Sequence, residues 1–270
     1  MPIIDFALAP QAVPDHVDIL VIGSGPAGMT VAAELIGSPL RVLVVESGGI
    51  EADLTITREA ADRFLIVTAA ATHMRDFTWL QRHIPDDARA MAVDVGSGMA
   101  VLSVMGPRSR ELLATLTDAD LSNTAFPFGT SQVIDLAYAR VRASRITYVG
   151  ELGWELYIPT EFAPGVFDAL MAQGAAFGLR LAGYHALNSL RMEKAYRHWG
   201  HDISDEDSPL QGGLGFAVAW DKPGGFIGRE ALLQQKEQGL NRRLVQFALD
   251  DPEPLLAEIA GLAEGSVTAR

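Results

Sequence analysis

Three glycines near the start of the chain have the spacing of a turn that binds a nucleotide. Gly23, Gly25 and Gly28 follow a short apolar run, and a second apolar run ends in Glu46. The first glycine permits a tight turn, the second lets the backbone approach a pyrophosphate, and the third lets a helix pack closely on a strand. A carboxylate at Glu46 would bond a ribose hydroxyl. The pattern predicts a βαβ unit that binds a dinucleotide; the alternative is a glycine-rich turn without a ligand.

A second pattern, formed by His198, His201 and Asp202, has a spacing that could ligate zinc. Zinc sites in proteins use three or four protein ligands, mostly histidine and cysteine. The next histidine upstream, His185, has no periodic relation to this pair, and the chain contains no cysteine. The sequence therefore predicts no metal site.

The composition narrows the classes of partner. The chain has 270 residues, a net charge of −13 and a pI near 4.8. Such an acidic chain argues against a nucleic-acid partner, which needs clustered lysine and arginine. The lack of cysteine excludes disulfides and thiolate catalysis. No apolar stretch has membrane-spanning length, and the first residues lack the basic region of a secretion signal. We therefore expect a cytoplasmic protein without a membrane partner.

Apolar periodicity predicts a mixture of strands and helices beyond residue 50. The expected strands are 54–57, 63–68, 91–95, 100–105, 133–142, 146–149, 154–158, 216–220 and 243–249. The expected helices are 73–84, 106–116, 161–177, 184–197 and 228–238. Because strands and helices do not alternate one for one, the pattern indicates an α+β fold rather than a doubly wound sheet.

The full residue sequence of the opening segment resembles a more specific family than its glycine spacing alone would indicate. The letters DILVIGSGPAGMTVAAEL and VLVVESGG, within residues 17–49, resemble the N-terminal FAD unit of flavin oxidoreductases of the glucose–methanol–choline type. The resemblance implies FAD as a cofactor, bound through Gly23, Gly25, Gly28 and Glu46. A single βαβ unit buries one end of such a ligand, so ancestry and present binding are separate predictions.

Five later phrases resemble a different family and keep its order. They are GGIEADLTITR, VMGPRSRELL, ITYVGELGWELYIP, ALNSLRMEKAYRHWGHDI and GFIGREAL. Together they resemble the folate-binding region of dimethylglycine and sarcosine dehydrogenases, which is similar to the aminomethyltransferase of the glycine cleavage system. The resemblance implies a partial aminomethyltransferase fold, in which tetrahydrofolate accepts a one-carbon unit from a small amine-derived substrate.

The same resemblance implies roles for four residues. Asp53 falls on the catalytic acid of the family, which orients the reacting amine and stabilises positive charge near it. Tyr148 would line the reacting site. Glu155 would pair with the donor groups of the pterin ring, because two carboxylate oxygens match an amino-pyrimidine edge. Arg191 would contact the folate tail or the pterin region.

The chain departs from that family's pattern at both ends of the resemblance. We expect a leader at 1–16, the partial nucleotide-binding unit at 17–49, a folate-binding domain at 50–250 that is incomplete at both ends, and a tail at 251–270. An incomplete cavity excludes water poorly and leaves apolar surface exposed. We therefore expect a homo-oligomer, or a partner subunit that covers the missing parts.

Three functional hypotheses follow. The first is folate-dependent one-carbon transfer. The second is an FAD-dependent oxidoreductase fragment that acts on a small amine or alcohol. The third is a truncated fusion without catalytic activity, so whether the chain is an enzyme stays open at this point.

Overall fold

The N-terminal segment contributes two short strands to the computed structural model. Strand β1 (Ile19–Ile22) pairs in parallel with β2 (Val42–Val45). Parallel neighbours need a crossover connection, which is the order that the predicted βαβ unit requires. The structure describes residues 19–22, 42–45, 48–84, 86–223, 225–226 and 228–246.

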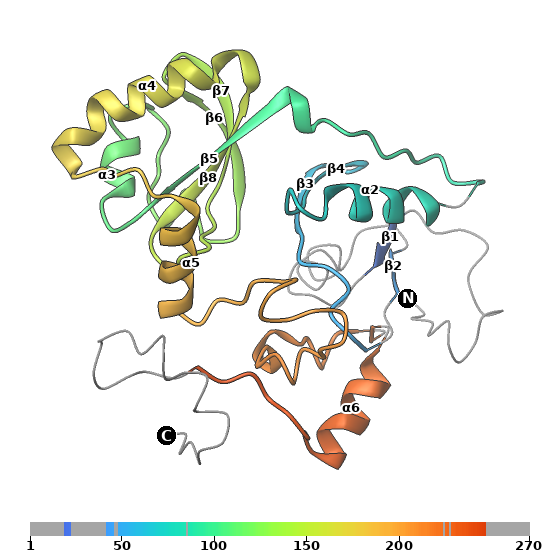
Figure 1. Cartoon of the computed structure of the whole chain (residues 1–270). Coiled ribbons are helices and arrows are strands. Elements are labelled where there is room, and N and C mark those ends of the chain that lie inside the picture. Colours follow the sequence, from blue (N-terminus) through green and yellow to red (C-terminus); the bar gives the residue numbers. More distant parts are fainter. Residues whose placement is uncertain are drawn as a thin grey trace, which may run out of the picture.

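The largest sheet of the described residues is a four-stranded antiparallel sheet (Figure 1). Its order is β5-β8-β7-β6. The strands are β5 (Met99–Met105), β6 (Ser131–Leu136), β7 (Ala139–Ser144) and β8 (Gly153–Pro159). Helices α3 (Ser109–Leu113) and α4 (Ala163–Gly174) lie over one face of this sheet.

The core lies between that face and the two helices. Alternate residues of β8 point into it, and Trp154, Leu156 and Ile158 are completely buried. On the opposite face, Val101 and Val133 are exposed, whereas the polar residues nearer the centre are partly covered. The covered face of the sheet is therefore apolar, whereas the open face carries both polar and apolar side chains.

A hairpin and a helix lie beside the open face (Figure 1). The hairpin consists of β3 (Thr55–Ala60) and β4 (Arg63–Val67), and α2 (His73–Arg82) follows it. Arg142 on β7 forms an ion pair with Glu59 on β3 at 2.7 Å. This half-buried pair ties the hairpin to the sheet.

The remaining described residues form irregular segments around two helices. Helix α5 (Tyr184–Glu193) leads into a long loop, and α6 (Arg229–Gln238) follows that loop. Two small apolar clusters support the loop. Their buried members are Ile50, Ile203 and Leu214 in one cluster, and Val218, Phe226 and Leu232 in the other.

The observed elements confirm the α+β fold, the hairpin and the helices at their predicted places. One prediction was wrong at 133–142, because this segment is two strands joined by a tight turn at Ala137 and Tyr138. Both turn residues have positive φ, +46° and +69°. Hairpin turns of this type favour glycine, asparagine or aspartate, and none is present here, so the sequence carried no turn signal.

Other predicted elements were wrong or too long. Three apolar runs, 91–95, 146–149 and 216–220, form no strand; nor does the described part of 243–249. The helices predicted at 106–116 and 184–197 are shorter than expected. A strand needs a neighbour to pair with, and alternation in one segment does not supply one. Within the described residues, no helix is long and apolar enough to cross a bilayer.

Candidate functional site

Arg191 is the one buried residue of α5, and its side chain is 1% exposed. Its Nε donates to Asn188 Oδ1 at 2.7 Å, one turn earlier on the same helix. Its Nη1 donates to the Tyr196 carbonyl at 2.9 Å and pairs with Asp202. Its Nη2 is buried and has no hydrogen-bond partner among the described residues. A buried donor without an acceptor is costly, so this atom marks a place where a ligand acceptor would be stabilising.

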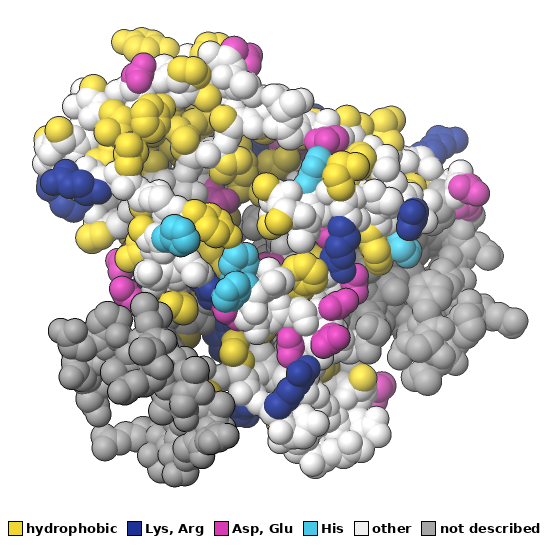
Figure 2. Space-filling model, viewed as in Figure 1, with side chains coloured by type: hydrophobic (Ala, Val, Ile, Leu, Met, Phe, Trp, Pro, Cys, Tyr) yellow, Lys and Arg dark blue, Asp and Glu magenta, His cyan; other side chains and the backbone are white. Residues whose placement is uncertain are grey.

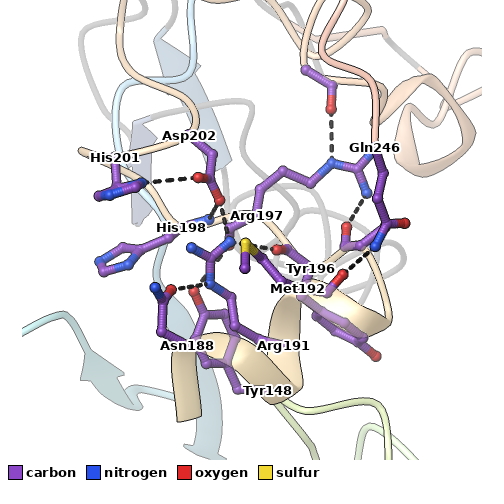
Figure 3. A network of polar contacts seen from close by, with 12 residues as sticks. Tyr148, Asn188, Arg191, Met192, Tyr196, Arg197, His198, His201, Asp202 and Gln246 are labelled. Atoms are coloured by element: carbon purple, nitrogen blue, oxygen red, sulfur yellow. Dashed lines mark hydrogen bonds and ion pairs between the residues drawn. The ribbon is translucent and has the colours of Figure 1, made fainter. Parts of the chain in front are cut away.

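Asp202 holds the other end of this ion pair (Figure 3). It accepts a hydrogen bond from the His198 backbone N–H at 3.0 Å and contacts His201 Nδ1 at 2.9 Å. Burial raises the pKa of Asp202, but the bonds from His201, Arg191 and His198 outweigh it and leave the pKa below its usual value. The carboxylate is therefore charged at neutral pH and keeps the Arg191 guanidinium in place.

Tyr148 lies next to this pair (Figure 3). Its hydroxyl donates to the Arg197 carbonyl at 3.2 Å. Burial raises the pKa of Tyr148 to about 12; Arg191 opposes the rise, while Asp53 and Asp202 add to it. The phenol therefore remains protonated at neutral pH and acts as a hydrogen-bond donor.

Asp53 precedes β3 in a short irregular segment. Its side chain keeps contact with solvent, yet the protein packed around its carboxyl raises its pKa, and the charge of nearby His198 opposes this rise. A group that is both accessible and closely surrounded lies in a concave part of a surface. Figure 2 shows histidine and hydrophobic side chains gathered on one face of the described part of the molecule.

Together these residues form what we call the acid–arginine cluster: Asp53, Tyr148, Arg191, His198 and Asp202. The His198 ring lies between the rings of Tyr184 and His201, with centroids 6.3 and 5.8 Å away. The structure thus brings together three of the four residues predicted for the folate site. The cluster offers an exposed carboxylate and a buried guanidinium donor, with a protonated phenol beside them.

Glu155, the fourth predicted residue, takes no part in these contacts. It lies on the open face of β8 and accepts a hydrogen bond from Tyr157 at 2.6 Å. No hydrogen bond, ion pair or ring contact joins it to the cluster in the described part of the chain. Burial, and next the charge of Glu155, raise the pKa of Tyr157. Its predicted role at the pterin ring stays a prediction.

Four residues near the start of the chain were predicted to bind a nucleotide. Gly23, Gly25, Gly28 and Glu46 lie outside the described residues. The parallel pairing of β1 and β2 describes the strands that flank them and no more.

Sequence reasoning assigned no role in the folate site to His198 or Asp202. Their spacing suggested a metal site and then argued against one. No group of three or more histidine, aspartate or glutamate residues among those described is arranged to hold a metal ion. Asp202 instead pairs with an arginine eleven positions upstream, across a turn. No local pattern in the sequence indicates that pairing.

Comparisons with known proteins give two family matches. The model described as the GCVT N-terminal domain matches residues 38–222, and the one described as an FAD binding domain matches residues 18–52. Among solved structures, the chain is similar to the glycine cleavage system aminomethyltransferase T from Bartonella henselae. The TM-score is 0.57 at 26% identity, over 72% of this chain and 51% of that one.

Several known proteins are similar to this chain in sequence. The chain is 43% identical to 4-methylaminobutanoate oxidase (formaldehyde-forming) from Paenarthrobacter nicotinovorans, over 78% of this chain and 25% of that protein. It is 40% identical to human mitochondrial sarcosine dehydrogenase, over 82% of this chain and 26% of that protein. It is 38% identical to the aminomethyltransferase of Listeria monocytogenes, over 77% of this chain and 56% of that protein. The chain therefore spans about a quarter of the length of the first two relatives.

Proposed function

This chain belongs to the family of GCVT N-terminal domains, and from that premise we propose that it takes part in tetrahydrofolate-dependent one-carbon transfer. The proposal places the folate substrate against the acid–arginine cluster. One observation carries it: the buried Nη2 of Arg191 has no acceptor among the described residues, and Tyr148 interacts with both Arg191 and Asp53. A pterin ring carries carbonyl and ring-nitrogen acceptors that would satisfy this donor.

Three residues of the cluster have a physical role in the proposal. Arg191 donates from Nη2, and the planar guanidinium matches the edge of a flat ring. Tyr148 keeps its hydroxyl hydrogen in the bond to the Arg197 carbonyl, so the phenol oxygen can accept a hydrogen bond from the substrate. Asp53 can stabilise positive charge that develops on a reacting nitrogen. Burial raises the pKa of Asp53 above its usual value, which favours a role in proton transfer.

The test is a titration of the purified chain with tetrahydrofolate, followed by thermal unfolding. A ligand at one hundred times its Kd stabilises the folded state by about 2.7 kcal/mol. We expect a clear rise in Tm, which Asp53→Asn and Arg191→Lys reduce. Asp168→Asn is the matched control, because Asp168 is exposed on α4, away from the cluster. An unchanged Tm at millimolar tetrahydrofolate would contradict the proposal.

A second candidate function is FAD binding by the N-terminal segment. The match to an FAD binding domain over residues 18–52 and the parallel β1–β2 pair favour it. Gly23, Gly25, Gly28 and Glu46 would then hold the adenosine-diphosphate end of the flavin cofactor. Flavin absorbance in the purified protein, lost in Gly25→Val, is the expected result. A colourless protein that takes up no added FAD would argue against this function.

The predictions about the partner, the substrate and the location of the protein are separate from these two functions. We propose that a second copy or a partner subunit completes the folate site. Exposed Leu181, Tyr184 and Met192 on and before α5 are consistent with a covered surface. Light scattering of the purified chain checks the first alternative. The small amine substrate and the cytoplasmic location stay predictions.

A further inference from the structure

Residues of a loop far along the chain form hydrogen bonds with both backbone groups of Ile50. The Ile50 N–H donates to the Asp207 carbonyl at 2.9 Å, and the Ile50 carbonyl accepts from Trp199 Nε1 at 2.6 Å. The Ile50 side chain is completely buried with Ile203 and Leu214, and the Trp199 ring packs against them. Both polar groups and the side chain of this residue therefore have fixed partners.

The residues on either side of Ile50 are held as closely. A Cβ at Gly49 would lie 1.9 Å from the Asp205 carbonyl oxygen, so glycine is required for this approach. The Arg75 guanidinium lies 4.8 Å from the centroid of the Trp199 ring. It also donates to the Glu51 carbonyl at 3.0 Å and pairs with the Glu51 carboxylate at 2.5 Å. Trp199 and Arg75 together clamp the segment that leads to Asp53.

The clamp joins two parts of the acid–arginine cluster. Asp53 lies two residues beyond Glu51, and Trp199 directly follows His198. Tyr148 is bonded to the carbonyl of Arg197, the residue before His198. The Trp199–Ile50 bond is therefore a short connection between the segment that carries Asp53 and the turn that carries His198 and holds Tyr148.

We infer that Trp199 is a positioning residue for Asp53. The indole N–H of Trp199 sets where the Asp53 carboxyl lies relative to His198 and Tyr148. The inference rests on the proposed function, because Asp53 is the group that would act on the substrate. Arg75 supports the same contact by covering the indole ring and binding Glu51. Neither residue needs to touch the substrate for this role.

The test replaces Trp199 with phenylalanine in the full chain. Phenylalanine keeps a ring under Arg75 and beside Ile50 but removes the N–H donor. The pKa of Asp53 is followed by carbon NMR of labelled carboxyl groups, and the Asp53→Asn variant assigns the signal. We expect the pKa to fall toward its usual value of 3.8, because burial is the larger influence on it and His198 the smaller. Tetrahydrofolate affinity, which also depends on Arg191, should change less than about threefold.

Two further variants make the result decisive. Trp220→Phe is the matched control, because its ring is also covered by a cation, Lys236 at 4.8 Å, and it lies in the other apolar cluster. It should leave the Asp53 pKa unchanged. Arg75→Met should move that pKa in the same direction as Trp199→Phe, and it decides the question if Trp199→Phe does not fold.

The outcomes separate this inference from the proposed function. A folded Trp199→Phe protein in which Asp53 titrates as in the wild type would overturn the inference. If the wild type binds no tetrahydrofolate but Trp199→Phe still shifts the Asp53 pKa, the proposed function fails and the positioning contact stands. A structural role alone would lower Tm and leave the Asp53 pKa in the folded protein unchanged.

Discussion

The sheet region, residues 99–177, and the loop region, residues 195–246 with the segment before Asp53, are stabilised in different ways. The sheet region has one continuous apolar core between its strands and α3 and α4. The loop region has two small clusters and depends on side chains that bond to distant backbone groups. Arg197, for example, donates to the carbonyls of Gly212 and Gly213 at 2.8 and 3.1 Å.

This difference shows why the candidate site lies where it does. The core of the sheet region is built mainly from hydrocarbon side chains, because burying a polar group without a partner is costly. Loops held by arginine and tryptophan donors can keep charged groups such as Asp53 close together and still open to solvent. The four predictions below compare the two regions, from the largest expected effect to the smallest.

The largest effect should come from the apolar core. Trp154 is completely buried and packs edge-on against Phe126 at 6.1 Å. Trp154→Ala should lower the free energy of unfolding by about 3–5 kcal/mol, since a cavity remains. Urea unfolding measures it. Phe128→Ala, at a residue 66% exposed, should cost less than about 0.5 kcal/mol. Equal costs would contradict the picture of a single packed core.

The next effect should come from the buried ion pair of the site. Arg191→Met removes the cation next to Asp202 and should cost about 2–4 kcal/mol at pH 7, because breaking a buried pair leaves a charge uncompensated. The pKa of Asp202 is lowered, so its stabilising effect is present above 3.8 and is lost as pH falls through its folded value. The cost of Arg191→Met should therefore shrink in acid.

The control for that variant is a nearby surface pair. Lys194 and Glu151 lie 3.3 Å apart with both side chains well exposed. Lys194→Met should cost below about 1 kcal/mol and show little dependence on pH. A cost of Arg191→Met that stays constant down to pH 3 would show that the charge of Asp202 is not what the arginine stabilises.

A smaller effect should come from the link between the sheet and the hairpin. Glu59 pairs with Arg142 at 2.7 Å and with Arg63 at 3.0 Å, but Arg142 is 14% exposed and Arg63 is 71% exposed. Arg142→Met should cost about 1–2 kcal/mol, and Arg63→Met less than about 0.5 kcal/mol. Both variants test the same carboxylate in one unfolding series. A larger cost for Arg63→Met would reverse this ranking.

The smallest expected effect is an increase in thermal stability. The pKa of Asp53 is raised, so folding favours its protonated form, and the folded state is penalised once pH exceeds the folded pKa. Asp53→Asn should raise Tm at pH 7 by about 1–2 °C, because solvent screens the exposed group. The gain should disappear below pH 3.8, where the carboxyl is protonated in both states. A lower Tm at pH 7 would mean that the charge of Asp53 stabilises the fold.

The sequence predicted those features that depend on local pattern. The hairpin, α2, α4, α6 and β8 follow from apolar periodicity, and the α+β fold follows from their order. The turn at Ala137 and Tyr138 was missed because its residue types do not favour positive φ. The boundaries at 17–49 and 50–250 are not tested by the structure and stay predictions.

The candidate site was predicted in part. Asp53, Tyr148 and Arg191 were named from their phrases and lie together, whereas Glu155 lies apart from them in its contacts. The roles of His198 and Asp202 in this cluster were missed, since each depends on a contact across a turn.

The amino-acid sequence by itself determined the residue types of the site, the acidic charge of the chain and the order of most elements, because these depend on neighbours along the chain. The tertiary structure alone decided which of those residues meet. Trp199 reaches Ile50, Asp202 reaches Arg191 and Glu59 reaches Arg142 across long separations in sequence. Such contacts exist only after the apolar clusters have brought the loops together, and no periodicity in the chain encodes them.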